Sequence, residues 1–376
     1  MAFMVAPTVL LAGVFLSIAL RTQQKPEQPA SEQLPLAALL PSSLGAEGSL
    51  PQADQKMPGQ KRTTVVAVGD IMLSRNVGAI IRKKKDVNYP YADTRDFTRG
   101  ADIAFANLET SITPGRPIVT GEMTFRADPE TVNGLADAGF DVVSLANNHT
   151  PNFGQKGLAD TFKYLRDAGI AYAGAGQDYA AAPAPAIVER NGLRFAFLAY
   201  NDHDVVPESY AAADGHAGTA IMQAVAVTAG VKAARAVADV VIVSMHSGHE
   251  YAYVPNKAQV EFAHAAIDAG ADLVIGHHAH VVQTVERYGG KMIFYGLGNF
   301  IFDQQWSVPT REGMAVRITF EGSRVTAAEA FPVYVTDAKP TFSEGLTADE
   351  TLAHLAVPAK KTEHGFLLDL PEPPLP

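Results

Sequence analysis

Six of the 11 histidines in this chain lie between residues 246 and 280, and His278 and His280 are separated by a single residue. This spacing allows two imidazoles to converge on adjacent metal ions from one turn. The chain contains no cysteine, which excludes thiolate zinc sites, iron–sulfur clusters and cysteine nucleophiles. Imidazole nitrogens combined with carboxylate and amide oxygens suit Mn, Fe or Zn better than copper. The residue types therefore predict a divalent metal site.

Side chains of these ligating types follow five short apolar segments, at the point where each segment ends. The segments are 65–68, 103–106, 142–146, 240–245 and 273–276, and the polar residues behind them are Asp70, Asn107, Glu109, Asn147, Asn148, His149, His246, His277, His278 and His280. In open α/β sheets, ligands bind at the carboxyl ends of the strands. A single Asp or Asn at a strand end is usually explained by a turn or a helix cap. Five such ends in one chain predict a shared site.

The elements that must position these residues alternate between strand and helix patterns. Apolar runs predict buried strands at 64–68, 103–106, 142–145, 194–199, 240–244, 273–275 and 292–295, and amphipathic stretches predict helices at 154–168, 229–238 and 257–269. Three Asp-Ala-Gly triplets, ending at Gly139, Gly169 and Gly270, place glycine where a left-handed cap closes a helix. The alternation predicts a layered α/β fold with a sheet core flanked by helices.

The two ends of the chain differ in composition from the body. Residues 2–20 carry no charge over 19 positions, which is about the length that crosses a bilayer as a helix, and no A-x-A-like cleavage site follows. We predict a transmembrane signal anchor at 1–21, with a cleaved signal and a secreted protein as the alternative. Residues 22–62 are expected to form a flexible linker, 63–336 the folded domain, and 337–376 a Pro-containing, loosely packed tail.

The charges beside the predicted anchor indicate which side of the membrane the folded domain occupies. Arg21 and Lys25 follow the apolar segment, and the positive-inside rule would place the body on the cytoplasmic side. An N-terminal signal anchor more commonly exports its body, and we expect a single-pass cell-membrane protein with the body on the exported side. The formal net charge of −10, from 30 basic and 40 acidic residues, argues against nucleic-acid binding.

Two other enzyme classes are disfavoured by missing motifs. The chain has no G-x-S-x-G nucleophile elbow, which argues against a serine hydrolase of the α/β-hydrolase type. It also lacks a phosphate-binding P-loop, and Gly174-Ala175-Gly176 lacks the third glycine of a dinucleotide fingerprint.

Six ordered motifs resemble the bacterial capsule-synthesis (CapA-like) family, which is linked to poly-γ-glutamate capsules and is similar to calcineurin-like metallophosphoesterases. The matching blocks are 68–75, 107–111, 144–158, 246–259, 270–283 and 295–304, and they include GDIMLSR, NLET, NNHTPNFG, HSGHEY, GHHAH and GLGNF. Each motif is weak by itself, but the ordered set spans nearly all of residues 64–304. The resemblance implies a metallophosphatase-like fold and a site that holds divalent metal.

The resemblance also implies roles for individual residues. Asp70 and His280 would bind one metal ion, and Glu109 stands where the superfamily usually has a bridging aspartate. The second ion would be bound by Asn148, His246 and His278. His149 resembles the histidine that protonates a leaving group. The superfamily's first motif is usually Asp-x-His, whereas Ile71 and Met72 follow Asp70 here, so the site is expected to hold one or two ions.

Further residues are expected to contact the substrate or to support the ligands, namely Arg75, Asn107, Glu250, His277 and Asn299. For Arg75 and Glu250, ion pairing at the surface is the alternative. The resemblance implies a membrane-anchored, metal-dependent hydrolase that acts on a phosphoester or an anionic polymer beside capsule synthase and export proteins. The alternative is a non-catalytic, metal-binding component of such a complex.

Overall fold

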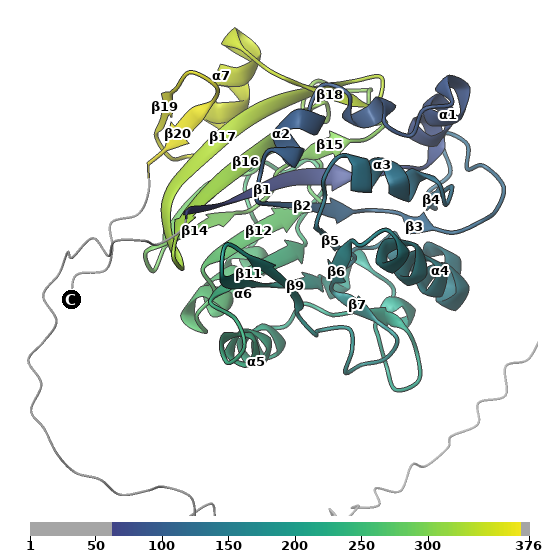
Figure 1. The fold of residues 1–376 in the computed structure, drawn as a ribbon, viewed down its shortest axis with the longest axis horizontal. Coiled ribbons are helices and arrows are strands. Elements are labelled where there is room, and N and C mark those ends of the chain that lie inside the picture. Colours follow the sequence, from purple (N-terminus) through teal and green to yellow (C-terminus); the bar gives the residue numbers. More distant parts are fainter. Residues whose placement is uncertain (1–61, 370–376) are drawn as a thin grey trace, which may run out of the picture. The chain divides into compact units, whose positions relative to one another are not determined.

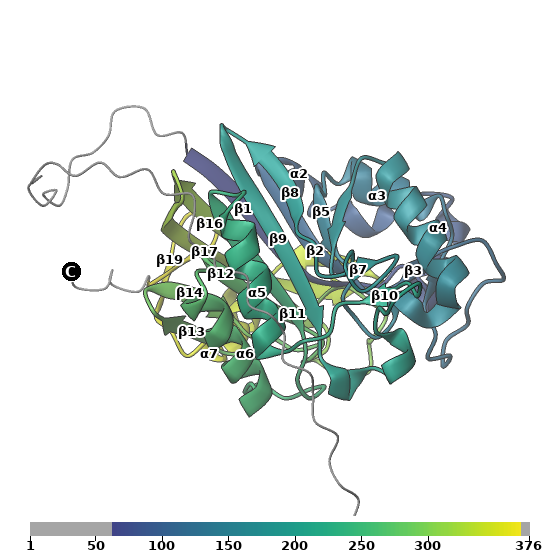
Figure 2. The ribbon, with the colours of Figure 1, turned by 90° about the horizontal axis from the view of Figure 1, so that it is seen from below.

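The computed structural model of the chain describes residues 62–369. Within this part, two β-sheets pack face to face, and helices cover the outer side of each sheet (Figures 1 and 2). The first sheet has ten strands in the order β19-β20-β17-β16-β1-β2-β5-β6, with β15 beside β1 and β18 beside β17. The second has six strands in the order β13-β14-β12-β11-β9-β8. The predicted layered α/β architecture is confirmed.

The ten-stranded sheet mixes parallel and antiparallel pairs. Its strands are β1 (Arg62–Ile71), β2 (Ile103–Leu108), β5 (Val142–Ser144), β6 (Ala171–Ala173), β15 (Asn299–Ile301), β16 (Glu312–Glu321), β17 (Arg324–Thr336), β18 (Lys339–Phe342), β19 (Ala359–Lys361) and β20 (Phe366–Leu368). Strands β1, β2, β5 and β6 run parallel, whereas β16 and β17 pair antiparallel. The parallel strands consequently end at one edge of the sheet.

The six-stranded sheet has a parallel centre as well. Its strands are β8 (Ala186–Arg190), β9 (Leu193–Asn201), β11 (Val240–His246), β12 (Leu273–His277), β13 (Val285–Tyr288) and β14 (Lys291–Phe294). Strands β9, β11, β12 and β14 are parallel. Two short pairs, β3 (Ser111–Ile112) with β4 (Arg126–Ala127) and β7 (Ala175–Gly176) with β10 (Gly218–Thr219), lie apart from both sheets.

The helices cover the outer sides of the two sheets, except for the last one, whose Leu352 packs against the core between the sheets. They are α1 (Arg75–Lys84), α2 (Arg95–Arg99), α3 (Thr131–Asp137), α4 (Gly154–Asp167), α5 (Ala224–Arg235), α6 (Lys257–Asp268) and α7 (Gly345–Ala353), with short 3₁₀ turns at Tyr89–Tyr91, Thr150–Phe153, His203–Val205 and Glu208–Tyr210. Residues of α1, α3 and α4 pack on the ten-stranded sheet, and residues of α5 and α6 pack on the six-stranded sheet (Figures 1 and 2). Because each helix buries one face, its apolar residues recur with the helical period, and this amphipathic pattern can be recognised in the sequence.

A single apolar core fills the space between the sheets. Phe105 of β2 stacks on Phe197 of β9 with ring centroids 5.4 Å apart, and Phe195 meets Phe320 edge to face at 5.5 Å. All four rings are buried. Because these aromatic side chains join the two sheets, the strand ends of both sheets are held at a fixed separation.

All seven predicted strands and all three predicted helices are present, with different ends. The helix expected at 229–238 is α5, which begins five residues earlier, at Ala224. Gly139, Gly169 and Gly270 have φ values of +82°, +74° and +111°, as expected for left-handed helix caps. The long antiparallel strands β16 and β17 carry no polar site residue and were not among the predicted strands.

The C-terminal part of the chain differs from the loosely packed tail expected for 337–376. Strands β18 and β20 pair with β17, and Leu355 and Leu368 are buried in the core between the sheets. These segments cover part of the long strand β17, whose backbone would otherwise be a free edge. The described chain therefore continues the fold as far as Asp369.

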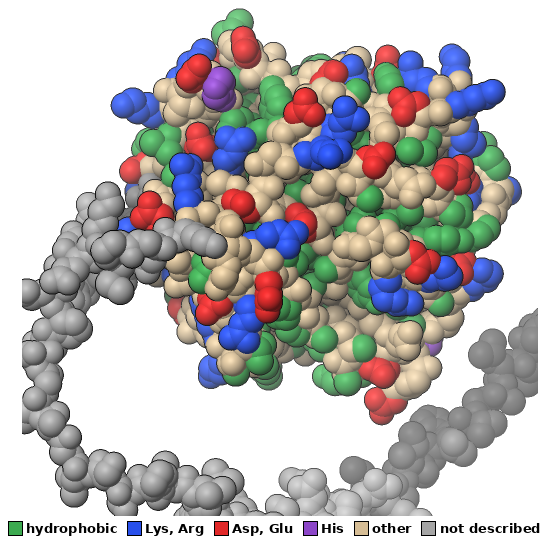
Figure 3. Space-filling view, in the orientation of Figure 1, with side chains coloured by type: hydrophobic (Ala, Val, Ile, Leu, Met, Phe, Trp, Pro, Cys, Tyr) green, Lys and Arg blue, Asp and Glu red, His purple; other side chains and the backbone are tan. Residues whose placement is uncertain are grey.

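The membrane anchor expected at 1–21 and the linker expected at 22–62 lie outside the described residues, except for Arg62, which begins β1. Residues 370–376 lie outside as well. Among the described residues, none of the helices combines the length and the hydropathy needed to span a membrane. Figure 3 shows basic and acidic side chains interspersed over one face of the molecule, without a large patch of either sign.

Gly276, the residue directly before His277, lies so close to the backbone of Tyr295 that no side chain fits there. A Cβ added to Gly276 would lie 1.9 Å from the carbonyl oxygen of Tyr295, which is closer than any real contact. We expect Gly276→Ala to destabilise the protein by about 3 kcal/mol, because β14 must move away. Gly192→Ala is the control, since nothing lies within 4 Å there and only its φ of +83° is strained, at about 1 kcal/mol. Urea unfolding midpoints of the two full-length variants would show equal losses if the contact were unimportant.

Candidate metal centre

Two rows of polar side chains face each other where the sheets end. In the ten-stranded sheet, Asn299, Asp70 and Asn107 are neighbours in register across β15, β1 and β2. In the six-stranded sheet, the neighbours in register across β9, β11 and β12 are Asn201, His246 and His277. The rows meet, because Asp70 Oδ1 lies 3.2 Å from His277 Nδ1 and Asn107 Nδ2 lies 3.3 Å from His246 Nδ1. Parallel strands thus bring together residues that are far apart in the sequence.

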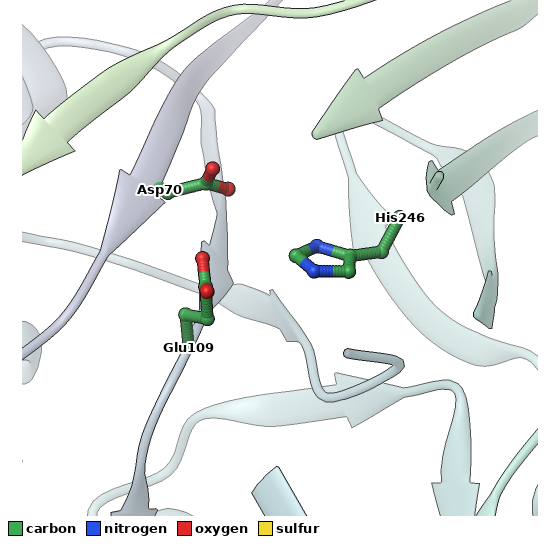
Figure 4. A group of neighbouring side chains, drawn as sticks. All are labelled: Asp70, Glu109 and His246. Carbon is green, nitrogen blue, oxygen red and sulfur yellow. The ribbon is translucent and has the colours of Figure 1, made fainter. Parts of the chain in front are cut away.

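Glu109 follows β2 and carries a buried carboxylate that has no hydrogen-bond partner among the described residues. Both of its oxygens are inaccessible, and neither accepts a hydrogen bond. Candidate ligand atoms of Asp70, Glu109 and His246 all lie within 4.8 Å of one another, and Figure 4 shows the three side chains directed toward a common point. Burial and the neighbouring charge of Asp70 raise the pKa of Glu109 well above its usual value. A buried charge without a partner is costly, and a bound cation would offset that cost.

His246, Asn148 and His278 form a second cluster beside Glu109. His246 Nε2 lies 3.0 Å from Asn148 Oδ1 and 3.1 Å from His278 Nδ1. Burial lowers the pKa of His246 well below its usual value and that of His278 to about 4, so both rings are neutral at pH 7. His278 has a φ of +92°, which is rare for a residue with a side chain. Neutral imidazoles and an amide oxygen in one place suit a divalent cation.

His280 is oriented by Asn299. The Asn299 amide nitrogen donates to the carbonyl of Thr310 at 2.8 Å and to Gln304 Oε1 at 3.0 Å. Its oxygen therefore accepts from His280 Nδ1 at 2.9 Å, which leaves Nε2 facing Glu109 Oε1 at 4.0 Å. Burial alone would lower the pKa of His280, but the charges of Glu109 and Asp70 raise it to about 9. Such support of a histidine is typical of metal ligands.

Asp70 is oriented by a chain of hydrogen bonds that begins at the backbone and passes through the side chains of two asparagines. Asn147 Oδ1 accepts from the backbone N–H groups of His149 and Thr150 at 3.0 and 2.8 Å, so its amide nitrogen must face Asn107 Oδ1, at 3.0 Å. Asn107 in turn donates to Asp70 Oδ1 at 2.8 Å. Burial would raise the pKa of Asp70, but the imidazoles of His277 and His280 hold it well below its usual value.

His149 lies at the rim of the centre and is oriented by Asn152. Asn152 Oδ1 accepts the backbone N–H of Phe125 at 2.8 Å, so it also accepts from His149 Nδ1, at 2.9 Å. The lone pair on His149 Nε2 then faces Glu109 Oε1, 3.6 Å away. The imidazole stacks on Phe125 with ring centroids 3.6 Å apart. Burial lowers the pKa of His149 to about 3, and the ring is neutral at pH 7.

The remaining predicted residues lie around this group. Arg75 pairs with Asp303 and lies over the Phe125 ring at 4.4 Å, so its charge is already compensated within the protein. Glu250 is exposed on an adjoining cleft of about 370 Å³. Nine residues line that cleft: Asn148, Asp202, Asp204, Val205, Gly248, His249, Glu250, Asn256 and His278. The structure thus gathers the predicted ligands at one place, with Arg75 and Glu250 at its margin.

Sequence reasoning missed two positioning residues. Asn147 belongs to the Asn-Asn-His run, but only its two neighbours were given roles there. Asn152 is three residues beyond His149 and lies within the NNHTPNFG motif, but no role was assigned to it there. Both act through hydrogen bonds to backbone groups of distant or neighbouring segments, which become visible only in the folded chain.

The donor set and its spacing fit a metal ion. Two atoms that each lie about 2.1 Å from one ion, at angles between 90° and 109°, are roughly 3.0–3.4 Å apart. The separations of His246 Nε2 from Asn148 Oδ1 and from His278 Nδ1 are 3.0 and 3.1 Å. Only oxygen and imidazole nitrogen are offered, and the orphaned carboxylate of Glu109 adds the negative charge that a cation requires. The residues therefore fit a divalent metal.

Comparison with known proteins shows which family the chain resembles. Residues 64–304 match the family described as bacterial capsule synthesis protein PGA_cap. The chain is 32% identical over 277 residues to the PGA biosynthesis protein CapA of Bacillus subtilis (strain 168), which covers 73% of this chain and 72% of that protein. It is 29% identical over 329 residues to the capsule biosynthesis protein CapA of Bacillus anthracis, with 85% and 79% covered.

A similar solved structure is that of a calcineurin-like phosphoesterase from Bacillus subtilis, with a TM-score of 0.46 and 13% sequence identity. The match covers 78% of this chain and 96% of that chain. At this level of similarity it carries no argument about function.

Because the buried carboxylate of Glu109 has no hydrogen-bond partner among the described residues, Glu109→Gln should change the thermal stability in opposite directions without and with metal. Without metal, the neutral amide relieves an unpaired buried acid, and the unfolding temperature should rise by about 2–4 °C. The raised pKa means that ionising Glu109 destabilises the folded state, so this gain should grow as the pH rises above the ordinary glutamate value of 4.5. With saturating Mn²⁺, the unmodified protein should gain stability and the variant should not.

Thermal unfolding of the full-length chain, with and without Mn²⁺, tests this crossover. Glu189→Gln is the matched control, because Glu189 is exposed on β8. An equal response of both variants to Mn²⁺ would show that Glu109 does not meet the cation.

Proposed function

The chain belongs to the PGA_cap family of bacterial capsule synthesis proteins, and we propose that it is a metal-dependent hydrolase of capsule or poly-γ-glutamate synthesis. Its substrate would be a phosphoester or a linkage within an anionic polymer. The observation that carries the proposal is the orphaned, buried carboxylate of Glu109 among Asp70, His246 and His280. Without a cation, this buried and unpaired carboxylate destabilises the fold, whereas a bound metal ion would compensate its charge.

The proposed ligands divide between two positions. Asp70, Glu109 and His280 would hold one ion, and Asn148, His246 and His278, with Glu109 between the groups, would hold the other. The ligand types suit Mn, Fe or Zn. When bound, the metal would supply positive charge that polarises the scissile group and makes a nearby water more acidic.

His149 is the proposed proton carrier. Its Nδ1 hydrogen is used by Asn152, so only Nε2 can exchange a proton with a substrate. The neutral ring would first take a proton from solvent water, and an anionic phosphoryl group close to Nε2 would favour the protonated form by raising the pKa. The protonated ring could then donate to a departing alkoxide. Phe125 stacks on the ring and keeps its plane fixed.

The lining of the adjoining cleft bears on how an anionic substrate would be held. Among the described residues, the cleft is lined by the carboxylates of Asp202, Asp204 and Glu250 and by neither lysine nor arginine. An anionic group would consequently be attracted by bound metal and not by cationic side chains. This favours recognition of one linkage at the metal centre over broad binding of a polyanion along the cleft.

The second candidate function is a non-catalytic metal-binding component of a capsule synthesis or export complex. The observation that favours it is Met72, which stands where the superfamily's first motif usually has histidine. Met72 is buried, and its sulfur accepts the backbone N–H of Ser74 at 3.1 Å. With one ligand fewer, the ion near Asp70 would be bound more weakly, which is compatible with binding but less favourable for hydrolysis.

Turnover by the full-length chain separates the two candidates. Phosphomonoester, phosphodiester and poly-γ-glutamate substrates should be tested with Asp70→Ala, His278→Ala and the control His264→Ala. His264 stacks on Tyr288 and pairs with Glu286, away from the predicted ligands. We expect the first two variants to lose at least about 100-fold in turnover and the control to be unaffected. Chelation should abolish turnover, and Mn²⁺ or Zn²⁺ should restore it.

Two results would decide against hydrolysis. Turnover that is unchanged in Asp70→Ala and His278→Ala would place any activity elsewhere. Loss of capsule in cells that carry these variants, with no hydrolysis of any substrate by the unmodified protein, would support the assembly function.

The proposed location is the cell membrane, with residues 1–21 as a single anchor and the body on the exported side. We expect the full-length chain to sediment with membranes and a chain lacking residues 1–21 to be released. Protease added outside intact spheroplasts should digest the body, whereas digestion only after lysis would place it in the cytoplasm. A soluble mature protein that lacks these residues would identify them as a cleaved signal.

A further inference from the structure

We propose that His277 is a metal ligand and binds, together with Asp70, one ion of the centre. This inference rests on the proposed metal site, but it assigns a residue that the family resemblance leaves without a metal role. His277 is the last residue of β12, and its side chain reaches Asp70 across the interface between the two sheets.

The imidazole of His277 is buried and has no hydrogen-bond partner within residues 62–369. Its side chain has 0% exposure, and neither Nδ1 nor Nε2 makes a hydrogen bond there. Buried polar groups are nearly always hydrogen-bonded, because an unpaired one loses its interaction with water. Because both ring nitrogens are unpaired among the described residues, we expect the ring to bind a partner from outside the chain, such as a metal ion.

The contact between His277 and Asp70 has the spacing of two ligands. Nδ1 of His277 lies 3.2 Å from Asp70 Oδ1 without the geometry of a hydrogen bond. The same oxygen already accepts from Asn107 Nδ2 at 2.8 Å. The separation falls within the roughly 3.0–3.4 Å that separates two atoms bound to one ion at ordinary angles. Shared coordination explains the close approach and the missing hydrogen bond together.

The surroundings leave few other partners for the ring. His277 is beside His246 in register, and the ring of Phe105 lies 6.1 Å away, centroid to centroid, within the core. The residue two positions after Asp70, Met72, turns its sulfur to the backbone N–H of Ser74. The chain thus offers Asp70 no imidazole from its own strand but one from the opposite sheet. An ion bound by Asp70 and His277 would join the two sheets directly.

Two substitutions distinguish a ligand from a hydrogen-bond donor. In both histidine and aspartate the first polar atom is attached to Cγ, so His277→Asp places an oxygen with a lone pair where Nδ1 was. His277→Asn can place an N–H group at the same point and retains a donor toward Asp70. His277→Ala removes both functions. If His277 is a ligand, the protein should tolerate the aspartate better than the asparagine, because a carboxylate binds a divalent cation more strongly than an amide oxygen does. If His277 is a donor, the order should be reversed.

The experiment uses the full-length chain in detergent, freed of metal and titrated with Mn²⁺ alone. Electron paramagnetic resonance of free Mn²⁺ gives the dissociation constant, and pulsed measurements of nitrogen coupling count the bound imidazoles. We expect His277→Ala to weaken binding at least about 30-fold and to lose one nitrogen coupling. His277→Asp should bind within about threefold of the unmodified protein, also with one coupling fewer. His277→Asn offers only a neutral amide oxygen and should bind more weakly than His277→Asp.

His264→Ala is the matched control, since His264 already has Glu286 as its partner. It should change neither the dissociation constant nor the nitrogen count. If His277→Asn keeps the original affinity while His277→Asp loses it, His277 is a donor to Asp70 and the proposal is wrong. Unchanged affinity and coupling in His277→Ala would also overturn it. Failure of the unmodified protein to bind Mn²⁺ would instead refute the whole metal centre, and absence of turnover would leave this result unaffected.

Discussion

Burying two carboxylates at the junction of two sheets is the constraint on which the rest of the site depends. Asp70 receives a hydrogen bond from Asn107 and has imidazoles beside it, whereas Glu109 receives no hydrogen bond at either oxygen from the part of the chain that the structure describes. The same burial therefore has opposite outcomes: the pKa of Asp70 is held down, and that of Glu109 is raised. Two acids in different environments are typical of sites that do chemistry. A cation placed between them would satisfy Glu109 and leave the support of Asp70 intact.

Rigid elements hold the groups around these carboxylates. Backbone N–H groups orient Asn147, which orients Asn107 and through it Asp70, and other amides orient His149 and His280 in the same manner. His278 and His280 adopt positive φ angles, a conformation that costs free energy and that the packed surroundings must maintain. Because each ligand is oriented by a partner that is itself fixed, binding of an ion would require little rearrangement.

The architecture connects the site to the stability of the fold. Asp70 and His246 come from different sheets, and the aromatic contacts between the sheets set the distance across which they meet. The C-terminal segment, with Leu355 and Leu368 in the same core, contributes to that packing although it lies far from the ligands in sequence. A change that separates the sheets would accordingly disturb the centre without touching a ligand. The cleft beside the centre is lined by the carboxylates of Asp202, Asp204 and Glu250, so positive potential there would have to come from an ion bound at the centre.

The types of the candidate ligands and the ends of the strands could be predicted from the sequence, because the buried parallel strands are apolar and end in polar residues. This was sufficient to predict the alternation of elements, the common edge and the chemical nature of the ligands, including the absence of sulfur. The tertiary structure decided which groups have partners. The orphaned oxygens of Glu109, the unpaired ring of His277 and the amide relay through Asn147 depend on distances between segments about 40 to 200 residues apart in the chain. No local pattern encodes such contacts, because register across two sheets is set by the packing of the whole core.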